Sequence, residues 1–320
     1  MKVLIADKFE KAGLEKLQAL GCQVTLDADL AGESLREAAR DSECNVLVVR
    51  STRVTPDIVE AGKSLELIIR AGAGYDTIDT AAAKQRDVRV CNCPGKNSVA
   101  VAELSMGLIL ALDRRIVDNV VDLRDGVWAK KEYSKARGLK GRTLGIGGLG
   151  RIGYELAKRA AAFEMNLIYS DVIEQKQIEQ ELGIRKVSFD QLLAEADFVS
   201  LHVPGGEGTR HMMGKEQFAM MKPTAFVLNC SRGGVIDETA LAEAIEKGEI
   251  AGAGLDVYEI EPKVTDNQFA DPVMKVKQVY GTHHIGASTE QAQLAVAEEV
   301  VRIIGEKMKG HELPNCVNFP

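Results

Sequence analysis

An arginine, two glutamates and three histidines in this sequence are of types that could together bind an anion and transfer a proton. The arginine could bind the anion, and a histidine with a carboxylate partner could transfer the proton. Arg232 follows an apolar run that is typical of a buried strand, and two glycines come directly after it. A guanidinium can hold a carboxylate through two parallel hydrogen bonds, and its charge would polarise a nearby carbonyl oxygen. Position alone leaves two readings open, because an arginine at a strand end either binds a ligand or caps a surface turn.

The histidines are the candidates for proton transfer, because an imidazole titrates near neutral pH. His283 and His284 stand next to each other, and His202 follows a different apolar run. A carboxylate bonded to the far ring nitrogen would orient the imidazole and favour its protonated form. Glu259 and Glu261 are both suitable, so the residue types do not choose between them or among the histidines.

A glycine-rich loop in the middle of the chain has the spacing of a dinucleotide-binding turn. The G-x-G-x-x-G pattern fits in two overlapping registers, starting at Gly145 or at Gly148. A strand must finish before the first glycine and a helix must begin near the last, so we expect the register Gly148, Gly150, Gly153. Asp171 follows the next apolar run, at a position where a carboxylate can bind ribose hydroxyls and repel a 2′-phosphate. The alternative is that Asp171 only caps the next helix. This order favours NAD over NADP.

Alternating strands and helices must position these residues. The apolar runs expected to be strands are 3–6, 46–49, 65–69, 88–90, 143–146, 167–169, 198–201 and 225–228. The helical patterns are 10–20, 34–39, 80–85, 98–125, 152–163, 189–194, 238–247 and 289–308. Such alternation predicts open α/β sheets with parallel strands. A break at 94–97 and the length of 320 residues predict two α/β units of similar type.

Four motifs, in this order, make the chain similar to the D-isomer-specific 2-hydroxyacid dehydrogenases. They are 144–153 (LGIGGLGRIG), 229–237 (NCSRGGVID), 254–262 (GLDVYEIEP) and 284–289 (HIGAST). Within that family the first half most resembles the D-3-phosphoglycerate dehydrogenases, through 49–51, 70–76 and 97–103. One departure is His283, which stands where many relatives have proline.

The resemblance implies two Rossmann-like, doubly wound parallel-sheet domains with the active site in the cleft between them. A discontinuous substrate domain would comprise 1–97 and 286–320, and the NAD-binding domain would comprise 98–285. It also implies homodimers paired through the cofactor domain. No large regulatory tail is expected, since the sequence ends at Pro320.

The resemblance also assigns roles to single residues in a hydride transfer between a small 2-hydroxy or 2-keto acid and the nicotinamide. Arg232 would hold the substrate carboxylate, His284 would be the acid–base group, and Glu261 would be its carboxylate partner. His284 is selected by the segment Ile-Gly-Ala-Ser that follows it, and Glu261 is selected by the following Pro262. The resemblance places His202 in a cofactor-binding loop. With the glycine loop, the expected cofactor contacts are Gly148, Gly150, Arg151, Ile152, Gly153, Asp171, His202, Val203, Pro204, Cys230, Ser231, Asp256, Gly286 and Ala287. The expected substrate contacts are Arg50, Ser51, Ala73 and Gly74, with Arg53 as a second cation for a phosphate.

The composition indicates which classes of binding partner are unsuitable for this protein. A net charge of -7 and the absence of a basic stripe argue against nucleic acid and anionic membranes. No signal peptide or spanning segment is apparent, and six scattered cysteines form no zinc pattern, so we expect a cytoplasmic protein with reduced thiols and no metal. The leading expectation is a D-3-phosphoglycerate dehydrogenase. Hydroxypyruvate or glyoxylate reductase is the close alternative, and an NAD-sensing scaffold of the same fold is the non-enzymatic one.

Overall fold

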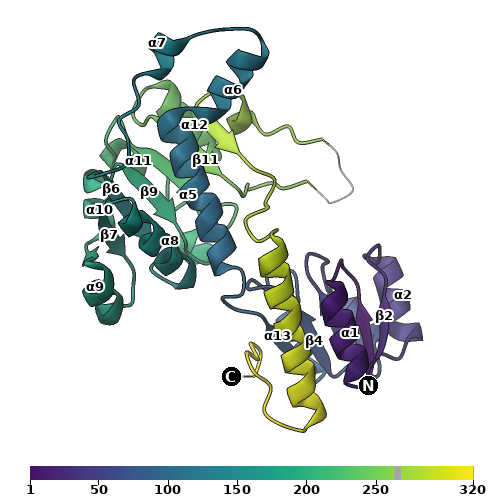
Figure 1. Ribbon diagram of the computed structural model, residues 1–320. Helices are drawn as coiled ribbons and strands as arrows, with labels where there is room; N and C mark the ends of the chain where they lie inside the picture. The colour runs from purple at the N-terminus through teal and green to yellow at the C-terminus, as the bar shows by residue number, and fades with distance from the viewer. Residues whose placement is uncertain (263–267, 320) are drawn as a thin grey trace. The chain divides into compact units, whose positions relative to one another are not determined.

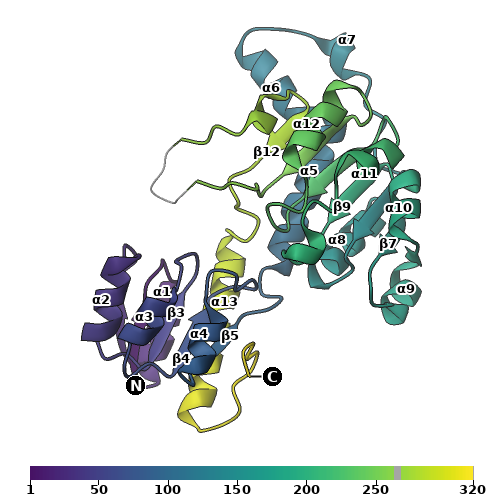
Figure 2. The same ribbon diagram turned by 180° about the vertical axis from the view of Figure 1, so that it is seen from behind.

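The computed structural model describes residues 1–262 and 268–319 and divides into two compact units (Figures 1 and 2). The first unit joins Met1–Asn97 to the segment that begins at Ser288, and the second is Ser98–Ala287. From the sequence, we expect the chain to pass from the second unit back to the first at residue 286, two residues before the boundary in the structure. Each unit contains one parallel sheet, so the expected pair of α/β domains is confirmed.

The first unit has a five-stranded sheet in the order β2-β1-β3-β4-β5. Its strands are β1 (Lys2–Ile5), β2 (Gln23–Leu26), β3 (Val46–Val49), β4 (Leu67–Arg70) and β5 (Arg89–Asn92). Its helices are α1 (Lys11–Ala19), α2 (Glu33–Asp41), α3 (Pro56–Ala61), α4 (Thr80–Gln85) and α13 (Glu290–Met308). Side chains alternate across the sheet, so that Leu47 packs in one buried cluster and Val46 in the other. Both faces are therefore covered, which explains why β3 is apolar at every position.

Two elements of this unit were not predicted. β2 lies at the sheet edge and most of its side chains are exposed, so it lacks the apolar run that marks the other strands. The short α3 begins at Pro56 and buries only Ile58 and Val59. The remaining strands and helices of the unit agree with the prediction to within a few residues.

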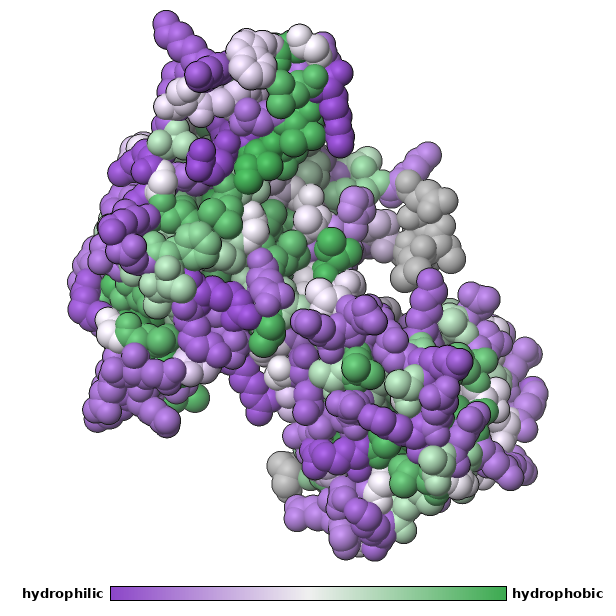
Figure 3. Space-filling view, viewed as in Figure 1, coloured by the Kyte–Doolittle hydropathy of each residue, from purple (hydrophilic) through white to green (hydrophobic). Residues whose placement is uncertain are grey.

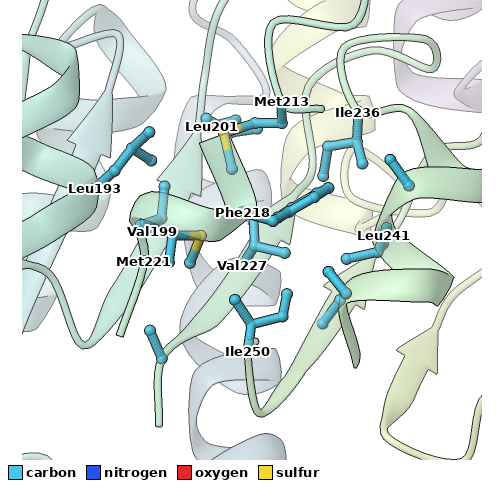
Figure 4. Close-up of a cluster of buried hydrophobic side chains, with 14 of the residues drawn as sticks. Leu193, Val199, Leu201, Met213, Phe218, Met221, Val227, Ile236, Leu241 and Ile250 are labelled. Carbon is cyan, nitrogen blue, oxygen red and sulfur yellow. The ribbon is translucent and has the colours of Figure 1, made fainter. Parts of the chain in front are cut away.

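The second unit has a seven-stranded sheet in the order β12-β11-β10-β9-β6-β7-β8. Its strands are β6 (Thr143–Gly147), β7 (Asn166–Ser170), β8 (Arg185–Lys186), β9 (Phe198–Leu201), β10 (Phe226–Asn229), β11 (Gly252–Leu255) and β12 (Val279–Gly281). Its helices are α5 (Ser98–Arg114), α6 (Ile116–Arg124), α7 (Lys130–Tyr133), α8 (Arg151–Ala162), α9 (Lys176–Leu182), α10 (Phe189–Glu195), α11 (Lys215–Met220) and α12 (Glu238–Glu246). Figure 4 shows the buried cluster on one face, where Phe218, Val199 and Val227 converge. The strand order reverses between β6 and β9, and in sheets of this kind ligands bind at the carboxyl ends beside such a switch point.

The single long helix predicted over 98–125 is wrong. Arg115 adopts a left-handed backbone conformation (φ 50°) and separates α5 from α6. Its guanidinium pairs with Asp118 of α6 (3.0 Å) and Glu132 of α7 (2.8 Å). These contacts stabilise a conformation that a bulky residue otherwise avoids. Apolar periodicity continues through the break, so the sequence pattern did not reveal it.

Candidate active site

His284 and Glu261 form a direct pair in the second unit. The ring nitrogen Nδ1 of His284 lies 2.8 Å from Oε2 of Glu261, in hydrogen-bonding range. His284 has a left-handed backbone (φ 51°), which is costly for a residue with a side chain and is common at functional sites. The neighbouring His283 is exposed and forms no hydrogen bond within the part of the chain that the structure describes. Geometry thus distinguishes two histidines that residue type alone leaves equivalent.

The environment of Glu261 keeps its carboxylate ionised. Partial burial acts to raise the pKa of Glu261, but the hydrogen bond and charge of His284 outweigh it. The backbone N–H of Tyr258, 3.3 Å from Oε1, and the charge of Arg232 act in the same direction. The net result is a pKa below the usual value, so a negative group faces the imidazole at neutral pH.

Arg232 belongs to the same neighbourhood as this pair. It follows β10, and its Nη1 donates a hydrogen bond to the carbonyl of Ser231 at 2.7 Å. The turn is held by Asn229, whose side-chain amide donates to the carbonyl of Arg232 at 2.9 Å. A Cβ on Gly233 would lie 1.8 Å from the carbonyl oxygen of Tyr258, so glycine is required for this turn to contact the segment that carries Glu261. The fold therefore brings a guanidinium, a carboxylate and an imidazole together from three separate segments.

Asp256 supports the loop that carries His284. It follows β11 and is almost completely buried, and it accepts hydrogen bonds from the hydroxyl of Thr282 (2.6 Å) and the backbone N–H groups of Ile285 and Gly286 (both 2.8 Å). A Cβ on Gly286 would approach Oδ2 to 2.8 Å. Sequence reasoning gave Asp256 a cofactor contact and missed this clamp, which joins residues some thirty positions apart.

Glu259, the alternative carboxylate, has other partners. Its Oε2 lies 3.0 Å from Nε2 of His211, and its Oε1 pairs with Arg210. The hydrogen bond from His211, the largest influence, and the charge of Arg210 lower the pKa of Glu259. Sequence analysis missed this second histidine–glutamate pair, because nothing in the local sequence around His211 indicates a partner in a distant segment.

The glycine loop has the geometry of a cradle for a phosphate-containing ligand. Gly148 has a positive φ (92°), and a Cβ there would lie 2.6 Å from the carbonyl oxygen of His202. A Cβ on Gly153 would lie 2.4 Å from the carbonyl oxygen of Gly148, so the helix α8 could not pack so close to the loop. A Cβ on Gly150 would meet nothing within 4 Å, which leaves open space at the N-terminus of α8. Backbone N–H groups at such an end favour an anion, so this loop fits the pyrophosphate of a dinucleotide.

Asp171 holds this loop. Its Oδ2 accepts from the N–H of Leu149 at 2.7 Å, and its Oδ1 accepts from the N–H of Ile173 at 2.9 Å. It does not cap the next helix, because α9 begins at Lys176 and its N-cap position is Gln175. Carboxylate oxygens accept more than one hydrogen bond, so this arrangement still allows ribose hydroxyls to bind.

His202 is poorly suited to proton transfer near neutral pH. Burial of its ring lowers the pKa of His202 to about 4, and its Nε2 lies 2.9 Å from the hydroxyl of Ser200. Its backbone carbonyl faces Gly148, and Val203 and Pro204 continue the same loop after β9. The ring is therefore neutral at physiological pH.

Cys230 and Ser231, two further expected cofactor contacts, are buried. Burial raises the pKa of the Cys230 thiol to about 12. The hydroxyl of Ser231 donates to Asn229 Oδ1 at 2.7 Å. Since both side chains are enclosed by protein, these residues offer a ligand mainly their backbone.

The expected substrate contacts lie in the first unit, around the partly exposed carboxylate of Asp7. Oδ2 of Asp7 accepts from the backbone N–H groups of Arg50 (2.6 Å), Ser51 (3.2 Å) and Thr52 (3.1 Å). Sequence analysis missed Asp7, although it follows β1, the neighbour of β3, and carboxyl ends of parallel strands meet at one edge. The guanidinium of Arg50 donates to Ser288 Oγ at 3.2 Å. The carbonyl of Ala73, next to Gly74, accepts from the side-chain amide of Asn92 at 2.6 Å.

Among the described residues, no group of three His, Cys, Asp or Glu side chains could hold a metal ion. No helix within 1–262 or 268–319 is both long and apolar enough to cross a membrane.

Comparison with known proteins decides the family. Residues 106–286 match the model of the D-isomer specific 2-hydroxyacid dehydrogenase, NAD binding domain. The chain belongs to this family. The family's NAD-binding domain corresponds to the second unit, which confirms the resemblance drawn from the four motifs.

Individual relatives carry several names. The D-3-phosphoglycerate dehydrogenase of Methanocaldococcus jannaschii is 42% identical over 322 residues, which is 100% of this chain and 60% of that protein. The hydroxypyruvate reductase of Thermotoga maritima is 46% identical over 267 residues, 83% of this chain and 85% of that one. A solved glyoxylate reductase from Paecilomyes thermophila has a TM-score of 0.87 at 30% identity and covers 99% of this chain and 98% of its own. The chain thus spans about three fifths of the phosphoglycerate dehydrogenase that it matches.

Proposed function

We propose that this chain is an NAD-dependent dehydrogenase of a D-2-hydroxy acid, with D-3-phosphoglycerate as the leading substrate. The observation that supports the proposal most strongly is the His284–Glu261 pair at 2.8 Å, within the electrostatic reach of Arg232. An NAD-sensing scaffold has no need of an ionised carboxylate bonded to an imidazole on a strained backbone. The same three residue types suit the chemistry of 2-hydroxy acid oxidation.

Each of the three side chains has a defined task in this proposal. When NAD is bound, the nicotinamide ring accepts or supplies the hydride. Arg232 holds the substrate carboxylate through its planar fork. His284 takes the hydroxyl proton during oxidation, or returns a proton to the keto oxygen during reduction. Glu261 orients the ring from Nδ1, which leaves Nε2 for the substrate oxygen.

The cofactor site supports NAD rather than NADP. Gly148 and Gly153 are positions where a side chain would clash, and the open space at Gly150 allows a close approach of phosphate oxygens. The Asp171 carboxylate beside the loop would bind ribose hydroxyls and repel a 2′-phosphate. We therefore expect NADH to bind more tightly than NADPH, and an Asp171→Ala variant to lose much of this preference.

The test is oxidation of NADH with a panel of 2-keto acids, including 3-phosphohydroxypyruvate, hydroxypyruvate and glyoxylate. His284→Ala should abolish turnover while NADH still binds. His283→Ala is the matched control, because the neighbouring histidine has no polar contact within the described residues, and it should keep activity. If the wild type binds NADH tightly but reduces no member of the panel, the scaffold is the better proposal.

A hydroxypyruvate or glyoxylate reductase is the second candidate. The Thermotoga hydroxypyruvate reductase is matched over 85% of its length, against 60% for the phosphoglycerate dehydrogenase. Arg50 discriminates between the two, because a substrate phosphate needs an additional cation. Arg50→Ala should reduce kcat/KM strongly with 3-phosphohydroxypyruvate only, and Arg53→Ala, which removes the expected second cation, should reduce it less. An equal loss with hydroxypyruvate would contradict the phosphoglycerate assignment.

We also propose that the protein is a homodimer paired through the second unit. Helix α6 and the following residues expose Val117, Val121, Leu123 and Trp128, and none of the residues of α6 is buried. Figure 3 shows hydrophobic residues gathered over this part of the unit. Contiguous apolar surface of this kind usually covers a partner. Val121→Asp should shift the mass measured by sedimentation toward a monomer, and an unchanged mass would count against this surface.

The state of the cysteines fits the expected cytoplasmic location, which we also propose. All six cysteines are present as free thiols, and five of them are buried. Reducing compartments maintain thiols in this form. Fractionation of cells that express the protein would test the location.

A further inference from the structure

The chain that follows α13 returns to the exposed edge of the first sheet and pairs with β5. The N–H of Val317 donates to the carbonyl of Val90 at 2.8 Å, and the N–H of Asn92 donates to the carbonyl of Asn315 at 3.3 Å. Asn318 adds side-chain bonds to the same edge, because its Oδ1 accepts from Val90 N at 2.8 Å. The tail thus forms a short antiparallel bridge on a strand that would otherwise be an open edge.

This pairing places two cysteines directly opposite each other. Cys91 and Cys316 are the bridge partners, and the two backbone hydrogen bonds lie on either side of them rather than between them. Such a non-hydrogen-bonded antiparallel pair has a Cα–Cα distance of about 4.5 Å, within the range of about 4.4–6.8 Å that a disulfide spans. Cys91 belongs to a buried cluster and Cys316 packs against the same cluster, while the Cys316 thiol donates to Oδ1 of Asn318 at 3.5 Å.

We propose that Cys91 and Cys316 form a site of reversible oxidation, at which a cross-strand disulfide fastens the C-terminal tail to β5. The oxidant is a low-molecular-weight disulfide such as glutathione disulfide. The thiolate of Cys316 attacks one of its sulfurs and releases one glutathione thiol. The thiolate of Cys91 then attacks Cys316 and releases the second. Two protein thiols are oxidised to one disulfide, and one glutathione disulfide is reduced to two thiols.

Burial sets the order and the rate of these steps. Cys316 is partly exposed, whereas Cys91 is fully buried, so the external disulfide can reach Cys316 first. Burial, together with the neighbouring Cys316 thiol, raises the pKa of Cys91 to about 12. Few Cys91 thiolates exist at neutral pH, so the second step should be slow and should become faster as the pH rises.

The nearby Cys93 provides a control within the same strand. It lies two residues from Cys91 and is equally buried, but its Sγ faces the carbonyl of Val296 at 3.9 Å. Since the bridge pairs Cys316 with Cys91, Cys93 should not enter the disulfide.

The bridge lies next to the loop that sequence analysis assigns to the substrate. Asn92 donates its side-chain amide to Ala73, and the N–H of Cys93 donates to the carbonyl of Gly72 at 2.8 Å. A disulfide at Cys91 would therefore stiffen the strand that supports this loop. It would also close a very long loop of chain, which restricts the unfolded state and raises the unfolding temperature.

The test uses the full-length protein incubated with increasing ratios of oxidised to reduced glutathione at pH 8. Peptide mapping without reduction should find one linked pair, Cys91 with Cys316, in the wild type and in Cys93→Ser. It should be absent from Cys91→Ser and Cys316→Ser, and dithiothreitol should remove it. The unfolding temperature of the wild type should rise by several degrees on oxidation, and that of Cys316→Ser should not.

Two results would overturn the proposal. One is a stable glutathione adduct on Cys316 that never resolves to the internal disulfide, even at high pH. The other is a linkage that uses Cys93 in place of Cys91. Because mapping reads the linkage itself, neither result depends on whether the proposed dehydrogenase activity is correct.

Discussion

The clamp formed by Asp256 can be tested against the cofactor contact expected from the sequence. Its carboxylate accepts three hydrogen bonds, from Thr282, Ile285 and Gly286, and its side chain is almost fully enclosed. In Asp256→Asn one oxygen becomes an NH2 group that faces a backbone N–H, so at least one of these bonds is lost. A hydrogen bond to a charged group contributes about 1.5–3 kcal/mol. For a unit of this size, that loss corresponds to a decrease of about 3–12 °C in unfolding temperature.

The clamped loop carries His284, so the substitution should also affect catalysis. A displacement of about 1 Å of a catalytic group can reduce the rate about 100-fold. We therefore expect kcat for keto-acid reduction to fall about 100-fold in Asp256→Asn, while the Kd for NADH changes only a few-fold. NADH oxidation, fluorescence titration of NADH and thermal unfolding would measure the three quantities.

Thr282→Val is the matched control. It removes the hydroxyl that donates to Asp256 at 2.6 Å and to the carbonyl of Leu255 at 3.5 Å, and it leaves both backbone bonds to Asp256. It should cost about 1 kcal/mol, and so lower the unfolding temperature by only about 2–4 °C. A wild-type unfolding temperature for Asp256→Asn, together with a loss mainly of NADH affinity, would contradict the role of Asp256 as a clamp. That outcome would make Asp256 a cofactor contact instead.

Three further predictions concern neighbouring features. Glu261→Gln should reduce kcat/KM for keto-acid reduction about 10- to 100-fold, because the bond from His284 loses its charged acceptor. Glu259→Gln should leave kcat/KM near the wild-type value. Equal losses in the two variants would contradict the assignment of Glu261 as the partner of His284. Burial, aided by a hydrogen bond to Asp271, raises the pKa of Glu238 to about 7. The folded state therefore keeps a proton that the unfolded chain loses near pH 4, so stability should fall as pH rises from about 4 to about 7, and Glu238→Gln should flatten this slope in thermal unfolding. Gly153→Ala places a Cβ 2.4 Å from the carbonyl oxygen of Gly148 and should weaken NADH binding, measured by titration, at least 10-fold. Gly107→Ala is the control: a Cβ there meets open space on helix α5, so it should leave NADH binding unchanged and leave the unfolding temperature unchanged or raise it.

Most buried elements could be predicted from the sequence because their signal is local. The runs Val46–Val49 and Phe198–Leu201 are apolar at nearly every position, and a strand covered on both faces requires this. The glycine register could also be chosen locally, since the end of β6 and the start of α8 fix where the turn lies. Where burial is slight the signal disappears, and β2 was missed for that reason.

The two α/β units, the glycine loop and the family could be predicted without coordinates, because strand, turn and helix propensities act over a few neighbouring residues. Residue types alone left Glu259 and Glu261 equivalent, as they did His283 and His284, and only the resemblance to the family favoured Glu261 and His284. The tertiary structure places Glu261 within 2.8 Å of His284, and it alone pairs Glu259 with His211. It alone also placed the carboxylate of Asp256 under the histidine loop. These contacts join segments that are more than twenty residues apart, and which segments meet depends on the strand order of the sheet, which local sequence patterns do not encode.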